Sequence, residues 1–196
     1  MIVTRGVVKR FGRRTVLAGL DAEIRTGRIT ALVGPNGAGK TTFLKVLLGL
    51  ARPTAGQVAI DGVILDGSPE YRAQIGYMPQ IVHFPAHLRG SDLMTMVTAL
   101  RGGTTQPDLS LAEAFDLGDT MRRPLGELSG GTRQKINAVL AFAFAPKLLI
   151  LDEPTAGLDP LAARILKDRI LAERARGTTV LITSHVLPEL EELADD

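Results

Sequence analysis

Cysteine is absent from this 196-residue sequence. Its absence excludes disulfide bonds and thiolate metal sites, and it is compatible with a cytosolic setting. Charge of one sign is not concentrated anywhere beyond the pairs Lys9-Arg10 and Arg13-Arg14, and the formal net charge is only +2. A nucleic-acid partner is therefore not expected.

Long hydrophobic runs are missing too. The most apolar stretch, residues 138–145, is far shorter than the roughly 20 residues that a membrane-spanning helix needs. The first ten residues lack the charged-then-apolar order of a signal peptide. If the protein serves a membrane process, we expect it to act from the cytoplasmic side through another chain.

Hydrophobic residues nevertheless make up 45% of the sequence, enough for one buried core. Short apolar strands alternate with helical patterns along most of the chain. Strands are predicted at residues 7–8, 16–24, 29–33, 56–64, 148–151 and 179–183, and helices from Lys40 onward and at residues 130–144, 161–176 and 189–193. This order predicts an α/β fold with a mostly parallel sheet, helices on both faces and N-terminal antiparallel strands.

The middle of the chain breaks this alternation. Residues 81–128 contain three prolines, the pair Gly102-Gly103 and two short helical patterns at residues 93–100 and 109–115. We therefore expect a single domain over residues 1–196, in which residues 1–80 and 129–196 form the core and residues 81–128 form a small helical insertion.

A glycine-rich segment after the third predicted strand fits the pattern G-x-x-x-x-G-K-[ST]. It contains Gly34, Asn36, Gly37, Gly39, Lys40, Thr41 and Thr42. Glycines let consecutive N–H groups point at phosphate oxygens, and the dipole of the following helix favours the anion. Lys40 can reach the β and γ phosphates, Thr41 can offer its hydroxyl to Mg²⁺, and Thr42 can add a hydrogen bond. The context, an apolar strand before and a helix after, favours a nucleotide site over an ordinary turn.

Two acids follow the apolar run at residues 148–151. Ligands of open α/β sheets bind at the carboxyl ends of such strands. Asp152 can hold Mg²⁺, and Glu153 can orient and deprotonate an attacking water. Paired acids at a strand end are common, so this interpretation depends on the glycine-rich segment upstream.

A second anion-type helix start follows the insertion. Ser129 is a good N-cap residue, and Gly130 and Gly131 leave the next helix without side chains at its beginning. One bound nucleotide does not need two such helix starts in a monomer. Both helix starts can be used if a second copy of the chain supplies one of them across an interface.

Taken in order, these motifs resemble the ATPase subunits of ABC (ATP-binding cassette) transporters, a class of P-loop NTPases, over nearly the whole chain. The resemblance assigns adenine stacking to Phe11, contact with Mg²⁺ and the γ-phosphate to Gln80, the D-loop to Asp159 and the switch histidine to His185. It implies a head-to-tail homodimer that closes on two ATP·Mg²⁺ and reopens on hydrolysis. It also implies a transmembrane permease subunit as partner, docked on the insertion, and a place on the cytoplasmic face of the cell membrane.

The sequence departs from that family in two places. Thr132 stands where the signature motif usually has glutamine, and the chain ends at Asp196, where family members usually continue. We expect the first change to be tolerated. For the second, either the chain is truncated or the full protein ends early, and in both cases we expect a sheet edge to be incomplete. The segment from Ser129 and the one around His185 are also similar to the ATPase of the copper-handling system that matures nitrous oxide reductase, although no residue pattern indicates copper.

Two other functions are compatible with parts of the pattern. A soluble ABC ATPase acting on nucleic acid or ribosomes would usually carry two cassettes or extra modules, which this sequence lacks. A small-molecule kinase would explain the phosphate cradle but neither Ser129 with its glycines nor Glu153.

Overall fold

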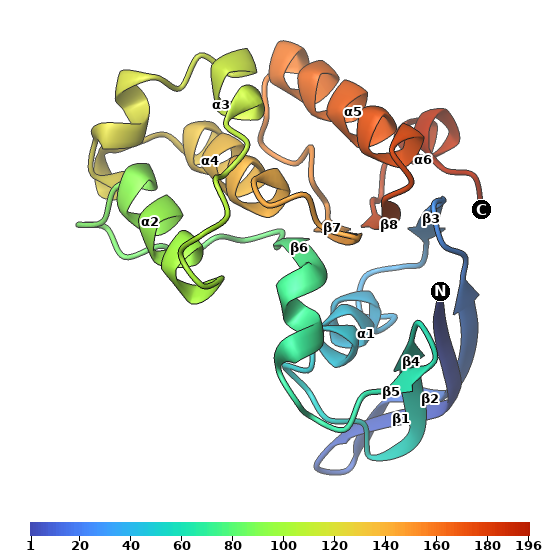
Figure 1. The fold of residues 1–196 in the computed structure, drawn as a ribbon. Coiled ribbons are helices and arrows are strands. Elements are labelled where there is room, and N and C mark those ends of the chain that lie inside the picture. Colours follow the sequence, from blue (N-terminus) through green and yellow to red (C-terminus); the bar gives the residue numbers. More distant parts are fainter.

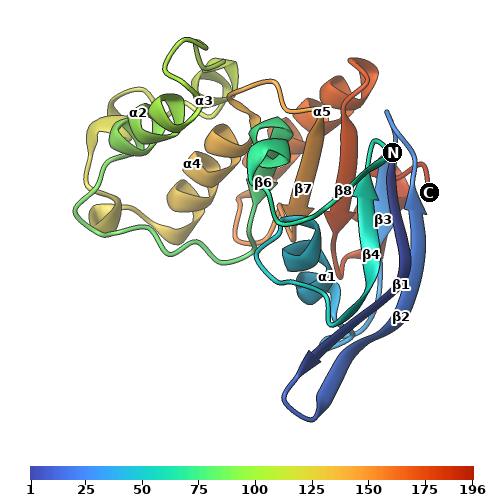
Figure 2. The same ribbon diagram turned by 60° about the horizontal axis from the view of Figure 1, so that its bottom comes forward.

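The computed structural model describes residues 1–196 and contains two four-stranded sheets (Figures 1 and 2). The antiparallel sheet has the order β2-β1-β4-β5 and consists of β1 (Ile2–Phe11), β2 (Arg14–Ile24), β4 (Ala55–Ile60) and β5 (Val63–Ile64). The parallel sheet has the order β3-β8-β7-β6 and consists of β3 (Ile29–Leu32), β6 (Ile75–Met78), β7 (Leu148–Asp152) and β8 (Thr179–Thr183). The predicted α/β fold is confirmed.

Helices cover both faces of the parallel sheet (Figure 1), and β7 shows why. All five of its residues are buried, and successive side chains point to opposite faces. Leu149 and Leu151 join the core formed with α4 (Gly130–Phe142), α5 (Pro160–Ala175) and α6 (Leu187–Leu193). Leu148 and Ile150 join the core formed with α1 (Lys40–Leu47) and the antiparallel sheet.

Residues 81–128 contribute no strand to either sheet. They form α2 (Gly90–Leu100), α3 (Ser110–Ala114) and the 3₁₀ turns η2 (Asp119–Arg122) and η3 (Leu125–Glu127). In both views this segment lies beside α4, away from the antiparallel sheet (Figures 1 and 2). The two helical patterns predicted in this segment correspond to α2 and α3. Helix α2 begins three residues before its predicted pattern. No helix of the molecule combines the length and the apolar character needed to cross a membrane.

Strand β6 and the 3₁₀ turn η1 (Glu70–Gln74) before it were not predicted from the sequence. The strand has only four residues, and one of them is Gly76. A Cβ at Gly76 would lie 2.1 Å from the carbonyl oxygen of Ala141 in α4, so the helix packs directly on the strand backbone. Glycine is required here because the backbones of α4 and β6 approach closely. Glycine has a low propensity for strands, so a prediction from propensity disfavours a strand at this position.

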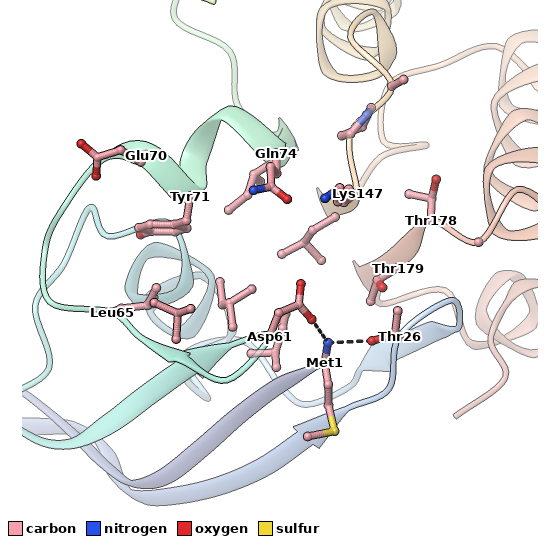
Figure 3. Close-up of a pocket in the computed structure, with 18 of the residues that line it drawn as sticks. Met1, Thr26, Asp61, Leu65, Glu70, Tyr71, Gln74, Lys147, Thr178 and Thr179 are labelled. Carbon is pink, nitrogen blue, oxygen red and sulfur yellow. Dashed lines mark hydrogen bonds and ion pairs between the residues drawn. The ribbon is translucent and has the colours of Figure 1, made fainter.

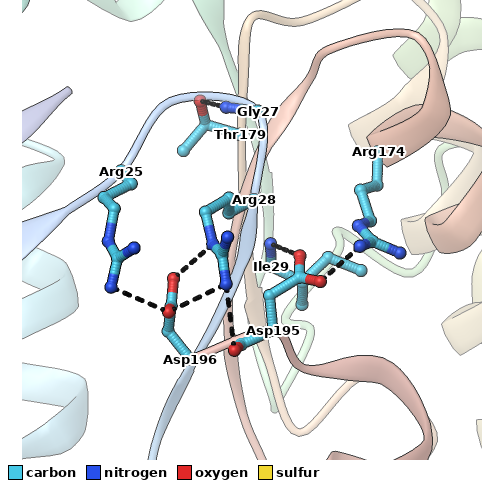
Figure 4. A network of polar contacts seen from close by, with 8 residues as sticks. All are labelled: Arg25, Gly27, Arg28, Ile29, Arg174, Thr179, Asp195 and Asp196. Atoms are coloured by element: carbon cyan, nitrogen blue, oxygen red, sulfur yellow. Dashed lines mark hydrogen bonds and ion pairs between the residues drawn. The ribbon is translucent and has the colours of Figure 1, made fainter.

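The last two residues lie along the outer edge of β3 (Figure 4). The Asp195 amide donates to the Ile29 carbonyl at 2.8 Å, and the Ala31 amide donates to the Asp196 carbonyl at 2.9 Å. The carboxylate of Asp196 accepts from Nε of Arg28 at 2.7 Å. Backbone and charge pairing together hold this end of the chain against the parallel sheet.

Candidate nucleotide-binding site

The glycine-rich segment connects β3 to α1 and is shaped by Gly39. Gly39 is the N-cap residue of α1 and has φ 96° and ψ 6°, a left-handed conformation that favours glycine. A Cβ at this position would also lie 3.0 Å from the Val16 carbonyl oxygen, so β2 touches the segment directly. No side chain caps α1, and its first turn contains no acid. Its first N–H groups are therefore available to an anion.

Lys40 is the first residue of α1 and bends back over the segment. Its Nζ donates to the carbonyl oxygens of Gly34 at 2.5 Å and Pro35 at 3.2 Å. Phosphate oxygens would compete with these carbonyls for the ammonium group, and an anion would be the stronger acceptor. The lysine is thus held over the concave side of the segment, where the sequence predicted that it would meet phosphate.

Asp152 ends β7 and is 3% exposed. Its Oδ2 accepts from the Thr41 hydroxyl at 3.2 Å, and its Oδ1 accepts from the Thr183 hydroxyl at 2.6 Å. Burial raises the pKa of Tyr77 in β6 to about 12, and the nearby charge of Asp152 adds to this shift. Two of the three predicted magnesium ligands, Thr41 and Asp152, are therefore neighbours although 111 positions separate them.

Glu153 follows β7 in a left-handed conformation with φ 52°, which is uncommon outside glycine. Its amide is fixed by the carbonyl and the hydroxyl of Thr183, both at 3.1 Å. One oxygen of its carboxylate lies 2.7 Å from Nδ1 of His185 and accepts from the His185 amide at 3.3 Å. The structure therefore brings together the predicted base and the predicted switch histidine.

These groups surround a cavity of about 490 Å³. Its lining comprises Phe11, Arg14, Val16, Pro35, Asn36, Gly37, Ala38, Gly39, Lys40, Thr41, Thr42, Gln80, Asp152 and Glu153. The cavity thus joins the phosphate segment to both acids, to Gln80 and to Phe11, which is 54% exposed.

Other predicted site residues lie outside this lining. Ser129 caps α4 by accepting from the Thr132 amide at 3.1 Å, and Gly130 and Gly131 follow in the first turn. Asp159 caps α5 and lies 2.8 Å from Nζ of Lys135. Hydrogen bonding to Lys135 lowers the pKa of Asp159. The chain therefore holds the signature segment and the D-loop residue apart from its own phosphate cavity.

Three residues of the site were missed by the sequence interpretation. Arg14 and Val16 line the cavity from β2, and Thr183 orients both acids from β8. Thr183 pairs with Asp152 in the register between β7 and β8, which a prediction of adjacent parallel strands could have revealed. No sequence signal marked Arg14, because its place depends on how the β1–β2 hairpin packs against α1.

A larger cavity of about 600 Å³ lies elsewhere, beside β5, η1 and the amino ends of β7 and β8 (Figure 3). None of the predicted site residues lines it. Several of its polar groups pair with one another: the Met1 ammonium group contacts Asp61 and the Thr26 hydroxyl, and the buried Glu173 accepts from Thr178. The phosphate segment, both acids and Gln80 line the cavity at Lys40 instead.

Comparison with known proteins agrees with this geometry. Residues 17–156 match the family model described as ABC transporter. The chain is 36% identical over 198 residues to the lantibiotic transport ATP-binding protein SrtF of Streptococcus pyogenes, covering 100% of this chain and 84% of that protein. It is 36% identical over 196 residues to the Nod factor export ATP-binding protein I of Burkholderia orbicola (strain AU 1054), covering 97% of this chain and 64% of that protein.

Solved structures give the same result. The ATP-binding subunit of an ABC transporter superposes with a TM-score of 0.90 at 30% identity, covering 100% of this chain and 83% of that chain. The dimeric bacterial ABC transporter cassette MJ0796 gives a TM-score of 0.87 at 22% identity, covering 98% and 91%, and supports the fold alone. Family and fold both favour ATP hydrolysis over phosphoryl transfer to a small molecule. The chain belongs to the ABC transporter family and is one of its ATP-binding, ATP-hydrolysing domains.

Proposed function

We propose that this chain powers transport through a separate membrane permease, and that it does so as a head-to-tail homodimer closing on two ATP molecules. The observation that supports the dimer is the division of the site. Lys40, Asp152 and Glu153 share one cavity, whereas Ser129 begins a helix outside it. In a two-fold pair, each cavity would face the partner's Ser129, and two complete sites would form.

Mg²⁺ suits the residues next to the phosphate segment. Mg²⁺ prefers oxygen ligands and usually binds through one or two carboxylates together with substrate phosphates. Thr41 and Asp152 supply one hydroxyl and one carboxylate, already within 3.2 Å of each other. The ion would neutralise developing charge on the phosphates, and Gln80 lines the same cavity beside these ligands.

The chain's own residues account for the remaining chemistry. Glu153 accepts a proton from the attacking water, whose oxygen forms a bond to the γ-phosphorus while the bond from that phosphorus to the β–γ bridging oxygen breaks. ADP leaves with the bridging oxygen. Lys40 and the first N–H groups of α1 stabilise the phosphate charge, and His185 turns from Glu153 to hold the γ-phosphate.

We place the permease contact on residues 81–128. This segment begins next to Gln80, so a movement of Gln80 on binding the γ-phosphate would reach it directly. It exposes apolar side chains that no part of this chain covers, among them Ile81 at 66%, Met96 at 52% and Leu100 at 84%. Docking here would place the chain on the cytoplasmic face of the membrane.

Export is the direction that the relatives favour. The two proteins compared above are named for lantibiotic transport and Nod factor export, and another relative is a daunorubicin resistance ATP-binding protein of Streptomyces coeruleorubidus. The expected link to copper receives no support from these relatives. We therefore propose an exporter ATPase whose cargo is selected by the permease.

The dependence of ATP hydrolysis on protein concentration tests the dimer. While dimerisation is incomplete, activity should rise more steeply than linearly with concentration, because each active site needs two chains. Strict proportionality from low to high concentration would indicate a self-sufficient monomer. Co-purification of a permease with the full-length chain, and its loss on changing Leu100 to Glu, would test the docking surface.

A further inference from the structure

The base end of the nucleotide cavity lies on the β1–β2 hairpin, which extends away from the rest of the molecule (Figure 2). Phe11 ends β1 and lines the cavity, and Lys9 lies two positions earlier on the same face of the strand. Nζ of Lys9 is 4.9 Å from the centroid of the Phe11 ring. An ammonium group within about 6 Å of a ring face is attracted to its π electrons. One face of the Phe11 ring is therefore already occupied.

Lys9 is itself held in place. Its Nζ donates to the Arg52 carbonyl oxygen at 2.7 Å, in the loop that follows α1. The Arg10 amide donates to the Thr54 hydroxyl at 3.0 Å, and the Thr54 amide donates to the Val8 carbonyl at 2.7 Å. These bonds attach β1, close to Phe11, to the loop that follows α1. The first turn of α1 belongs to the phosphate segment.

The second strand of the hairpin contacts the phosphate segment directly. A Cβ at Gly39 would lie 3.3 Å from a methyl group of Val16 as well as 3.0 Å from its carbonyl oxygen. Because Phe11 pairs with Arg14 across the hairpin, fixing one strand limits the movement of the other. The hairpin that carries Phe11 is therefore attached both to the phosphate segment and to the loop that follows α1.

We infer that Lys9 is a positioning residue of the nucleotide site. Its ammonium group covers one face of the Phe11 ring and fixes the ring's orientation, so that the other face is presented to the purine base of ATP. This inference rests on the proposed function, and in particular on Phe11 stacking with the base. A ring already oriented loses less side-chain freedom on binding than a mobile one, so ATP binds more tightly.

The test compares Lys9→Met with Arg13→Gln. Both remove one positive charge from the hairpin, but Arg13 is exposed at its tip and does not line the cavity. Binding is measured for ATP·Mg²⁺ and for tripolyphosphate·Mg²⁺, which has no base. Lys9→Met should weaken ATP binding about threefold to tenfold and leave tripolyphosphate binding unchanged. In hydrolysis it should raise KM for ATP and leave kcat unchanged, because the base takes no part in the reaction. Arg13→Gln should change neither the preference for ATP nor KM.

Two further variants separate positioning from general damage to the hairpin. Lys9→Arg keeps a cation that can lie over the ring, so it should retain the wild-type preference for ATP over tripolyphosphate. In a Phe11→Ala background, Lys9→Met should have no additional effect on ATP binding, since no ring remains to be oriented.

Each of three results would overturn the inference: unchanged ATP affinity in Lys9→Met, equal weakening of both ligands, or full additivity with Phe11→Ala. Loss of the preference in Lys9→Arg would also contradict it. Failure of the proposed function would be seen in a different measurement: hydrolysis strictly proportional to protein concentration would contradict the dimer, whereas the preference of the wild-type protein for ATP over tripolyphosphate and its loss in Lys9→Met would remain.

Discussion

Two helices of this molecule begin in a way that suits an anion, and their surroundings differ. Helix α1 begins after Gly39 without a side-chain cap, inside a cavity that also contains both acids. Helix α4 begins at Ser129, whose hydroxyl is already engaged by the amide and the hydroxyl of Thr132. A Cβ at Gly130 would meet nothing within 4 Å. The first helix start shares a cavity with two acids of its own chain, whereas the second lies outside that cavity.

Similar local structure at two helix starts therefore does not give two complete sites. An anion at the start of α1 would meet Lys40 and lie near Glu153, whereas the start of α4 offers N–H groups and the hydroxyls of Ser129 and Thr132. A second chain could supply what each helix start lacks.

Replacing the base should remove most activity at the start of α1. Glu153→Gln keeps the size of the side chain but cannot accept a proton, so hydrolysis should fall by about 10²-fold or more while ATP binding is retained. ATP-bound dimer should then accumulate, as measured by size-exclusion chromatography. Glu191→Gln, an exposed acid on α6, is the matched control and should hydrolyse ATP normally. Normal hydrolysis by Glu153→Gln would remove Glu153 from the mechanism.

Mixing two inactive variants tests whether the two helix starts work together. Lys40→Ala removes the charge that meets phosphate, and Ser129→Arg blocks the start of α4, so each alone should be nearly inactive. A mixed dimer contains one site with both residues intact, and random mixing should restore about a quarter of wild-type turnover if sites are independent.

The control for mixing is Lys40→Ala combined with a double variant carrying both changes. That mixture cannot form an intact site, so it should remain inactive. Activity absent from both mixtures would argue that each chain acts alone.

Substitutions of the two glycines at the start of α4 should separate an effect on stability from an effect on hydrolysis. A Cβ at Gly131 would lie 2.8 Å from the Gly157 carbonyl oxygen, so Gly131→Ala must displace backbone and should destabilise the fold by about 1–3 kcal/mol. Gly130→Ala meets open space and should raise the free energy of unfolding by about 0.5–1 kcal/mol. It should nevertheless slow hydrolysis, because the methyl group would face the partner's ATP. Melting temperature and turnover, measured on both variants, distinguish the two effects.

An ion pair attaches the helical segment (residues 81–128) to the core, and its loss should have only a small effect on stability. Asp108 lies 2.7 Å from Nη2 of Arg169 in α5, and hydrogen bonding from Ser110 and Arg169 lowers the pKa of this carboxyl. Its side chain is 41% exposed, so solvent screening reduces the contribution to about 1 kcal/mol. Asp108→Asn should therefore lower the melting temperature by about 2–4 °C at neutral pH.

The sign of the pH dependence follows from the lowered pKa of Asp108. In the unfolded chain this carboxyl takes up its proton near pH 3.9, whereas the folded protein keeps the charge to lower pH. The stabilisation is therefore complete above about pH 4 and is lost as the pH falls through the folded value. The difference in melting temperature between wild type and Asp108→Asn should be constant from pH 7 to pH 5 and shrink below pH 4. A constant difference down to pH 2 would exclude this ion pair as its cause.

Much of the fold could be predicted because its strongest elements have simple patterns. The run at residues 148–151 is continuously apolar since β7 is buried on both faces, and the phosphate segment is marked by glycines that its backbone requires. Strand β6 escaped prediction because Gly76 serves the packing of α4, a requirement that lies 65 positions away in Ala141. The first strand was predicted only at residues 7–8, although β1 spans Ile2–Phe11 and includes the buried Thr4.

The chemical groups of this protein are recognisable from its sequence alone: a phosphate segment, two acids after an apolar strand and a second helix start with serine and glycines. Local patterns suffice for these, because each depends on neighbours within a few positions. Which of these groups share a cavity depends on tertiary packing. Parallel pairing of β7 with β8 brings Thr183 to Asp152, and the packing of the β1–β2 hairpin brings Lys9 to the Arg52 carbonyl and Phe11 to the cavity at Lys40. These contacts join residues far apart in the chain, and non-local packing leaves no periodic signal for a sequence to show.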